Sequence, residues 1–137
     1  MSKVIKIRKG LNIPLVGQPE KVLIRADMAE TYAVKPSDFP GLTPKLNVQV
    51  GDKVKAGNPL FHDKYRPNIV FSSPVSGEVV EVRRGDRRVI EEVVVKTTGS
   101  VDYEQFEAVS PVQLTREQVV EKLLKSGTWP YLRQRPY

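Results

Sequence analysis

The stretch Val48–Val82 reads VQVGDKVKAGNPLFHDKYRPNIVFSSPVSGEVVEV, and glycine punctuates it in two similar places. The half-units GDKVKAG and SPVSGEVV flank a short apolar segment that begins at Leu60-Phe61. Short apolar runs separated by Gly, Asn and Pro at close intervals are typical of all-β proteins with tight turns. The stretch therefore predicts a compact all-β fold with turns at Gly51-Asp52 and Gly57-Asn58-Pro59.

The sequence that follows extends the same pattern. Glu78–Val82 alternates charged and apolar residues, Gly85-Asp86 marks a hairpin tip, and Val89–Val95 is predicted as the return strand. Two glycine-bearing halves around a central hairpin resemble the barrel-sandwich hybrid, the small fold of biotinyl and lipoyl carriers. We therefore expect a mainly β, barrel-sandwich hybrid fold, with Val93 and Val95 on one face of the return strand.

A carrier function stays open as an alternative. Carriers hold the modified lysine at the tip of the central hairpin. Here Asp63-Lys64 lies a few residues early for that position, and Tyr65-Arg66-Pro67 is predicted to occupy the tip. The neighbouring His62 is interpreted as a surface strand residue without a functional role.

Composition excludes several kinds of protein. With no cysteine and one histidine in 137 residues, the chain has no disulfide, thiol nucleophile or His-rich metal site. No Ser, His and Asp set can be assembled around one histidine, so no catalytic residues are predicted in the isolated chain. No apolar run approaches the roughly 20 residues of a transmembrane helix, and the start MSKVIKIRKG lacks a signal-peptide core. A cytoplasmic location is the expectation.

The net charge of +6 raises the question of a polyanionic partner. The densest basic cluster surrounds the predicted hairpin tip and comprises Arg83, Arg84, Arg87 and Arg88. A nucleic-acid-binding barrel remains an alternative, but no base-stacking aromatic residue stands beside the cluster, and acidic residues flank it. We expect the four arginines to contact a partner protein or anionic lipid, and we expect no nucleic acid.

The residue composition of the chain changes along its length. Val4–Arg8 alternates apolar and basic residues and is predicted as an edge or closing strand, whereas Thr31–Pro44 is rich in turn residues and is predicted as a loop. Val101–Pro111 is predicted to be irregular. We divide the chain into a barrel domain, residues 1–100, and a linker, a helix and the start of a further α/β domain, residues 101–137.

One helix is well signalled after the linker. Thr115 is a good N-cap, and Gln118 completes a capping box that Leu114 and Val119 can support through a hydrophobic staple. Gly127 stands where a helix C-terminal glycine belongs. The apolar stripe of this helix consists of Val119, Val120, Leu123 and Leu124.

The last nine residues, Trp129–Tyr137, hold the only tryptophan and two of the five tyrosines. A free tail with three large aromatic residues would expose an apolar patch. Either the tail folds back on the barrel or a further domain follows it, and the second interpretation is favoured.

Two further segments carry a family resemblance. IKIRKGLNIPLVGQPE near the start and LLKSGTWPYLRQRPY at the end stand on either side of the glycine-bearing stretch. With these segments in this order, the chain resembles the N-terminal part of the A subunit of the bacterial sodium-translocating NADH:quinone oxidoreductase.

The resemblance implies a part in a respiratory complex that oxidises NADH, reduces a membrane quinone and exports Na⁺. It implies that NADH, the flavins and the iron–sulfur centre belong to partner subunits, that this chain binds no cofactor of its own, and that it lies peripherally at the cytoplasmic face of the bacterial inner membrane. An alternative is the related electron-transport protein that binds NADH and flavin through a Gly-rich loop. The corresponding place here has Gly127 alone, so no phosphate-binding loop is visible.

A quinone site needs an apolar slot, aromatic faces and donors for the carbonyl oxygens. Two segments offer them, Thr31–Phe39 and Trp129–Tyr137. The candidate quinone-binding residues are Tyr32, Lys35, Trp129, Tyr131, Arg133 and Arg135. The competing interpretation is that the aromatic residues only pack between domains.

Overall fold

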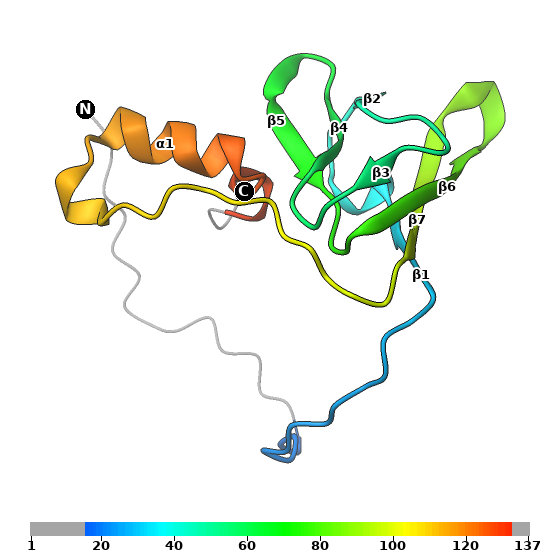
Figure 1. The fold of residues 1–137 in the computed structure, drawn as a ribbon, viewed down its shortest axis with the longest axis horizontal. Helices are drawn as coiled ribbons and strands as arrows, with labels where there is room; N and C mark the ends of the chain where they lie inside the picture. The colour runs from blue at the N-terminus through cyan, green and yellow to red at the C-terminus, as the bar shows by residue number, and fades with distance from the viewer. Residues whose placement is uncertain (1–15, 133–137) are drawn as a thin grey trace.

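Two antiparallel sheets pack against each other in the computed structural model, which describes residues 16–132 (Figure 1). One sheet has the strand order β1-β7-β6-β3, with β1 at Thr31–Val34, β3 at Lys53–Val54, β6 at Gly77–Arg84 and β7 at Ile90–Thr97. The other has the order β2-β4-β5, with β2 at Pro44–Leu46, β4 at Pro59–Asp63 and β5 at Arg66–Ser72. The all-β prediction for the glycine-punctuated stretch is confirmed.

The core lies between the two sheets. Its fully buried side chains are Leu60 and Phe61 from β4, Val79 from β6, and Val93 and Val95 from β7. Burying one such side chain contributes about 1.5–3 kcal/mol. The prediction that Val93 and Val95 share a face is therefore confirmed, because successive side chains of a strand point to opposite faces and these two point into the core.

The structure explains why the second half-unit, SPVSGEVV, has a glycine at position 77. Gly77 begins β6 and pairs with Thr97 of β7. A Cβ atom at Gly77 would overlap the carbonyl oxygen of Lys96, because the two backbones approach closely there. Only glycine fits this position.

The prediction that Thr31–Pro44 is a loop is wrong at both of its ends. Thr31–Val34 forms β1, which pairs with β7 from Thr31 opposite Lys96 to Val34 opposite Val93. Thr31, Tyr32 and Val34 all favour strands, but the strand is only four residues long and turn residues follow it closely, so the sequence prediction missed it. Pro44 already belongs to β2, and the turn-rich part between them contains the 3₁₀ helix η1 at Pro36–Asp38.

The tip of the β4–β5 hairpin also differs from the prediction. The two turn residues are Lys64 and Tyr65, and Arg66 already pairs with Asp63. The buried Asp63 carboxylate sets this turn by accepting a hydrogen bond from the backbone N–H of Tyr65 at 3.2 Å. Lys64 therefore does lie at the hairpin tip, where a carrier holds its lysine.

The predicted helix is confirmed as α1, Arg116–Lys125. The Thr115 hydroxyl accepts from the backbone N–H of Gln118, and the Gln118 side chain accepts from the backbone N–H of Thr115 at 2.9 Å. Gly127 has φ +70°, and the N–H groups of Gly127 and Thr128 donate to the carbonyls of Leu124 and Leu123. This pattern is a Schellman motif that ends the helix.

α1 lies beside β5, and an extended segment connects it to the barrel (Figure 1). The prediction that Val101–Pro111 is irregular is confirmed up to Ser110, where the only regular feature is an isolated bridge between Tyr103 and Ala56, whereas Pro111 begins a 3₁₀ helix. The short 3₁₀ helices η2, η3 and η4 span Asp86–Arg88, Pro111–Gln113 and Trp129–Tyr131. The predicted strand Val4–Arg8 lies outside the described residues, and within these residues no helix is long and apolar enough to cross a membrane.

Candidate functional site

Four aromatic rings meet where η1 and η4 approach the barrel. Phe39 contacts Phe71 edge-on with ring centroids 4.5 Å apart, and it contacts Tyr131 in the same manner at 5.8 Å. Phe61 stacks on Phe71 with centroids 5.0 Å apart. We call these four residues the aromatic cluster. Edge-to-face pairs of this kind contribute about 0.5–1.5 kcal/mol beyond the area that they bury.

Two 3₁₀ turns bring Phe39 and Tyr131 together. The buried Pro36 begins η1, and its carbonyl accepts from the backbone N–H of Phe39 at 3.1 Å. In η4 the N–H of Tyr131 donates to the carbonyl of Thr128, also at 3.1 Å. η1 thus brings Phe39 against Phe71 of β5, and η4 brings Tyr131 against Phe39, so the contact joins segments that are far apart in the sequence.

An open hollow of about 540 Å³ lies beside the cluster, and we call it the η1 hollow. Phe39 belongs to both the hollow and the aromatic cluster. The hollow is lined by Lys35, Pro36, Ser37, Phe39, Pro40, Gly41, Leu42, Pro44, Val89, Ile90, Glu91 and Glu92. The lining is therefore largely apolar and also includes the charged residues Lys35, Glu91 and Glu92.

Lys35 is held in an ion-pair network at the edge of this hollow. Its Nζ lies 3.2 Å from Oε1 of Glu92, and Oε2 of Glu92 lies 2.7 Å from Nη1 of Arg83. Glu81 also pairs with Arg83, at 3.2 Å. The hydrogen bond with Glu81, reinforced by the charges of Glu81 and Glu92, raises the pKa of Arg83 above its ordinary value. Because Lys35, Arg83 and Glu81 are about half exposed, these pairs fix side-chain positions more than they add stability.

The structure places the candidate quinone-binding residues in different surroundings. Lys35 lines the η1 hollow and Tyr131 joins the aromatic cluster, so Phe39 links the two segments that hold them. Tyr32 lies on β1, half-buried against the core, and its hydroxyl accepts from the backbone N–H of Ala29 at 3.1 Å. Trp129 is half-buried in η4. Arg133 and Arg135 lie outside the described residues.

The sequence did not reveal the central role of Phe39 and Phe71. Phe39 falls within the segment Thr31–Phe39 that the sequence singled out, but an isolated phenylalanine carries no local signal for a site. Phe71 reads as an ordinary core residue of a strand. Only the packing of η1 and η4 on β5 shows that the two rings meet.

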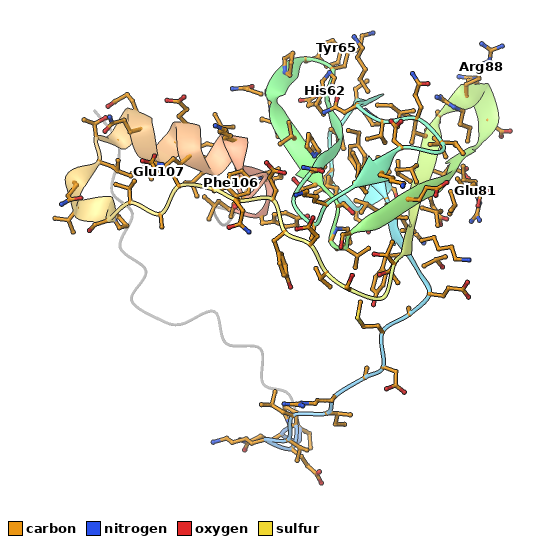
Figure 2. All side chains as sticks on the ribbon, in the orientation of Figure 1. His62, Tyr65, Glu81, Arg88, Phe106 and Glu107 are labelled. Atoms are coloured by element: carbon orange, nitrogen blue, oxygen red, sulfur yellow. The ribbon has the colours of Figure 1, made fainter. Side chains whose placement is uncertain are left out.

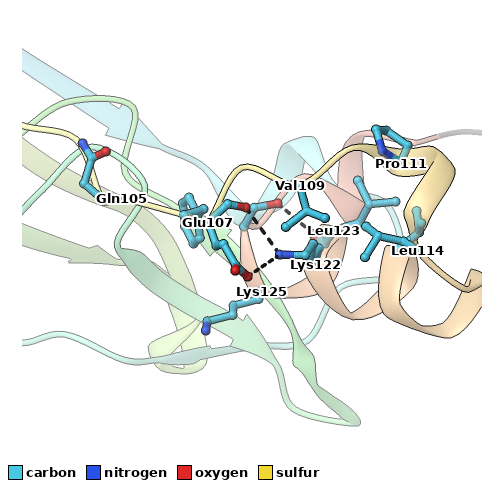
Figure 3. A pocket seen from close by; sticks show the side chains of 11 residues that line it. Gln105, Glu107, Val109, Pro111, Leu114, Lys122, Leu123 and Lys125 are labelled. Atoms are coloured by element: carbon cyan, nitrogen blue, oxygen red, sulfur yellow. Dashed lines mark hydrogen bonds and ion pairs between the residues drawn. The ribbon is translucent and has the colours of Figure 1, made fainter.

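A second groove, of about 340 Å³, lies between the linker and α1 (Figure 3). The Lys122 ammonium lies across it and contacts the Glu107 carboxylate at 3.3 Å and the Glu107 carbonyl at 3.4 Å. Leu114 and Val119, predicted to form the hydrophobic staple, both line the groove. Its lining is Gln105, Phe106, Glu107, Val109, Pro111, Leu114, Val119, Lys122, Leu123, Lys125 and Ser126.

The two sheets, the glycine-bearing half-units and the central hairpin together define a barrel-sandwich hybrid domain. Residues 5–98 match the family described as the NqrA N-terminal barrel-sandwich hybrid domain, and the chain belongs to that family.

Curated relatives agree with this assignment, and each of them is the A subunit of a Na(+)-translocating NADH-quinone reductase. Over 98% of the chain it is 44% identical to the protein of Tolumonas auensis. It is 38% identical to that of Neisseria meningitidis serogroup A and 40% identical to that of Vibrio atlanticus, again over 98% of the chain. The chain spans 31% of the length of the first of these relatives and 30% of the other two.

Proposed function

We propose that this chain works as the N-terminal domain of the NqrA component in a Na⁺-translocating NADH:quinone reductase. The family match supports the proposal because it covers the whole barrel, from residue 5 to residue 98. The relatives' similarity continues through the linker and α1, since it extends over 98% of the chain. The domain would act within the complex, with NADH, flavins and the iron–sulfur centre on partner subunits.

Within that complex, the domain contributes to quinone binding at the aromatic cluster and the η1 hollow. The observation that carries this assignment is the position of Phe39, which faces the hollow and contacts Tyr131. A quinone ring binds against aromatic faces, and its carbonyl oxygens need hydrogen-bond donors. Lys35 is the donor at the hollow, and it would share its ammonium between the quinone and Glu92.

The proposed location is peripheral, at the cytoplasmic face of the bacterial inner membrane. Other subunits of the complex and the membrane quinone are the proposed partners. The name of the relatives supports a membrane-bound partner set, because a quinone reductase that translocates Na⁺ must act at a membrane.

The single tryptophan gives a direct test of quinone binding. Trp129 lies in η4, two residues before Tyr131. A short-chain benzoquinone titrated into the chain should quench Trp129 fluorescence with saturation. Phe39→Ala should raise the half-saturating concentration about tenfold, because losing one aromatic contact costs about 1.4 kcal/mol of binding free energy. Phe106→Ala, in the other groove, is the matched control. Linear, unsaturable quenching that is equal in all three proteins would refute the site.

A carrier function is the second candidate, since Lys64 lies at the tip of the β4–β5 hairpin. Carriers present their modified lysine at this place. Intact-mass measurement of the protein from cells that contain biotin and lipoate ligases decides the matter. A mass increase that Lys64→Arg abolishes would establish the carrier function, and an unmodified mass would remove it.

Gly127 does not favour the alternative of an NADH- and flavin-binding loop at this place. Gly127 is the only glycine after the helix, and it adopts φ +70° to complete the Schellman motif. Its backbone N–H donates to Leu124, so it is not free to bind phosphate.

A further inference from the structure

Two hairpin tips project toward the same end of the barrel. Figure 2 shows Tyr65 at the tip of the β4–β5 hairpin and Arg88 at the tip of the β6–β7 hairpin, both at the top of the view. Lys45 of β2 lies beside the first hairpin, since it pairs in register with His62. We call this end of the barrel the two-hairpin face.

Basic side chains predominate on this face. The exposed cations of the two tips and of β2 are Lys45, Lys64, Arg66, Arg84, Arg87 and Arg88. The exposed carboxylates of the same segments are Asp86 and Glu91, whereas Asp63 is buried. The excess of positive charge is therefore concentrated at the tips.

Arg83 does not belong to this face, although the sequence groups it with its three neighbours. Its guanidinium is engaged by Glu81 at 3.2 Å and by Glu92 at 2.7 Å. Figure 2 places Glu81 further down the hairpin, away from Arg88. The cluster of four arginines thus separates into Arg83, which pairs with two glutamates, and three exposed residues, Arg84, Arg87 and Arg88.

Large apolar groups accompany the cations at both tips. Tyr65 is 74% exposed and Val89 is 57% exposed. The Lys64 ammonium lies 5.7 Å from the centre of the Tyr65 ring, so cation and ring project together. Amphipathic aromatic residues next to cations are characteristic of surfaces that meet the headgroup region of a membrane.

The backbone of the second tip is strained. Arg87 and Arg88 have φ values of 54° and 62°, in the left-handed region that non-glycine residues rarely adopt. Arg84 supports the turn by donating from Nη1 to the carbonyl of Arg88 at 3.1 Å. Strain retained at an exposed tip, where the core does not require it, points to a role for the side chains presented there.

We propose that the two-hairpin face docks on an anionic phospholipid surface. Arg84, Arg87, Arg88 and Lys64 would contact the phosphate groups, and Tyr65 and Val89 would enter the headgroup region between them. Two tips that project in the same direction suit a flat surface. This contact extends the proposed function, yet the vesicle assay contains neither quinone nor partner subunits, so its failure would leave the quinone proposal standing.

The test is co-sedimentation of the 137-residue chain with vesicles of phosphatidylglycerol and phosphatidylcholine. The triple variant Arg84→Gln, Arg87→Gln and Arg88→Gln should lower the partition coefficient about a hundredfold, because each cation near the surface contributes about fivefold. The matched control Lys21→Gln, Arg25→Gln and Lys53→Gln removes the same charge from exposed positions off the tips. Thermal unfolding midpoints of both variants verify that they are folded.

A second variant separates the apolar contribution from the charge. Tyr65→Ala should weaken binding several-fold and leave its dependence on salt unchanged, since no charge is lost. The proposal is overturned if the tip variant and the control variant bind equally, or if the chain binds pure phosphatidylcholine as well as the anionic vesicles. A third outcome would also overturn the proposal: the tip variant binds vesicles as well as the unmodified chain but fails to assemble with partner subunits. That outcome would indicate that the face binds an acidic protein.

Discussion

Gly77 shows how one residue can fix the pairing of two strands. The carbonyl of Lys96 occupies the space that a Cβ would need. The obstructing atom belongs to the backbone of β7, so the clash cannot be relieved by turning a side chain.

We therefore expect Gly77→Ala to lower the free energy of unfolding by about 3 kcal/mol, the upper end of typical overpacking costs. Urea denaturation measures the change. Gly99→Ala is the control, because its φ of +83° is strained for alanine but nothing lies within 4 Å of the added Cβ. The explanation fails if Gly77→Ala costs less than Gly99→Ala.

A second residue-scale prediction concerns pH. The Lys96 ammonium lies 2.9 Å from the Glu30 carboxylate, and the hydrogen bond from Lys96, with its charge, lowers the pKa of Glu30. A carboxyl whose pKa is lower in the folded state stabilises the fold above its unfolded-state pKa. This contribution is lost as the pH falls through the folded-state pKa.

Carboxyl NMR titration should thus find the pKa of Glu30 below its ordinary value, and Lys96→Met should return it toward that value. Lys55→Met, which breaks the pair with Asp102 instead, should leave Glu30 unchanged. An unmoved Glu30 titration in Lys96→Met would show that the ion pair does not form in solution.

At the scale of elements, α1 depends on its caps. No residue of the helix is fully buried, so local hydrogen bonds hold a large share of its stability. Replacing Thr115 by Ala removes the hydroxyl that accepts from Gln118, and the helix should lose about 1 kcal/mol.

Amide hydrogen exchange measures this loss of stability separately for each helix and strand. Protection should fall in α1 and stay constant in β7. Ser110→Ala is the matched control, because Ser110 precedes η3 without forming a side-chain cap. Equal protection of α1 in the Thr115 and Ser110 variants would contradict the role of the capping box.

Local signals predicted some elements and missed others. The helix and the β6–β7 hairpin were visible because caps, glycines and alternation mark them in the sequence. β1 was not, because Thr31–Val34 is only four residues long, turn residues follow it, and its partner β7 lies far away in the sequence. The turn at Lys64-Tyr65 depends on the buried Asp63 carboxylate, and burial cannot be read from the local sequence.

For the whole molecule, the linker is an integral part of the barrel surface. The backbone N–H of Ala56 donates to Asp102 at 2.9 Å, and the Ala56 carbonyl accepts from Glu104 at 2.8 Å. The Asn58 side chain also donates to Glu104, at 2.8 Å. The proposed domain boundary at residue 100 thus cuts through these contacts.

A chain of residues 1–100 should still form both sheets, since the core residues all precede the boundary. It should unfold at a lower temperature than the 137-residue chain, because Ala56 loses both backbone partners and the Phe39 ring loses Tyr131. Circular dichroism during heating measures both properties. An unfolded short chain would show that residues 101–137 belong to the barrel domain itself.

The candidate site is harder to predict from the sequence than the fold, for a physical reason. Lys35 and Tyr131 come from segments with no local relation, and only the position of Phe39 relates them. The residue types alone suggested that both segments could bind a quinone. They did not show that the Tyr32 hydroxyl accepts a hydrogen bond from Ala29, or that Lys35 forms an ion pair with Glu92.

The most direct experiment replaces the corresponding N-terminal part of NqrA, in an assembled bacterial complex, by this chain. Na⁺-stimulated quinone reduction by NADH is then measured in membrane vesicles, with assembly of the complex checked on the same sample. A chain that is the N-terminal domain of NqrA will restore activity, and Phe39→Ala within it will weaken the apparent affinity for quinone. A complex that assembles fully with the chain in place, yet shows no Na⁺-stimulated quinone reduction, would contradict the proposed function.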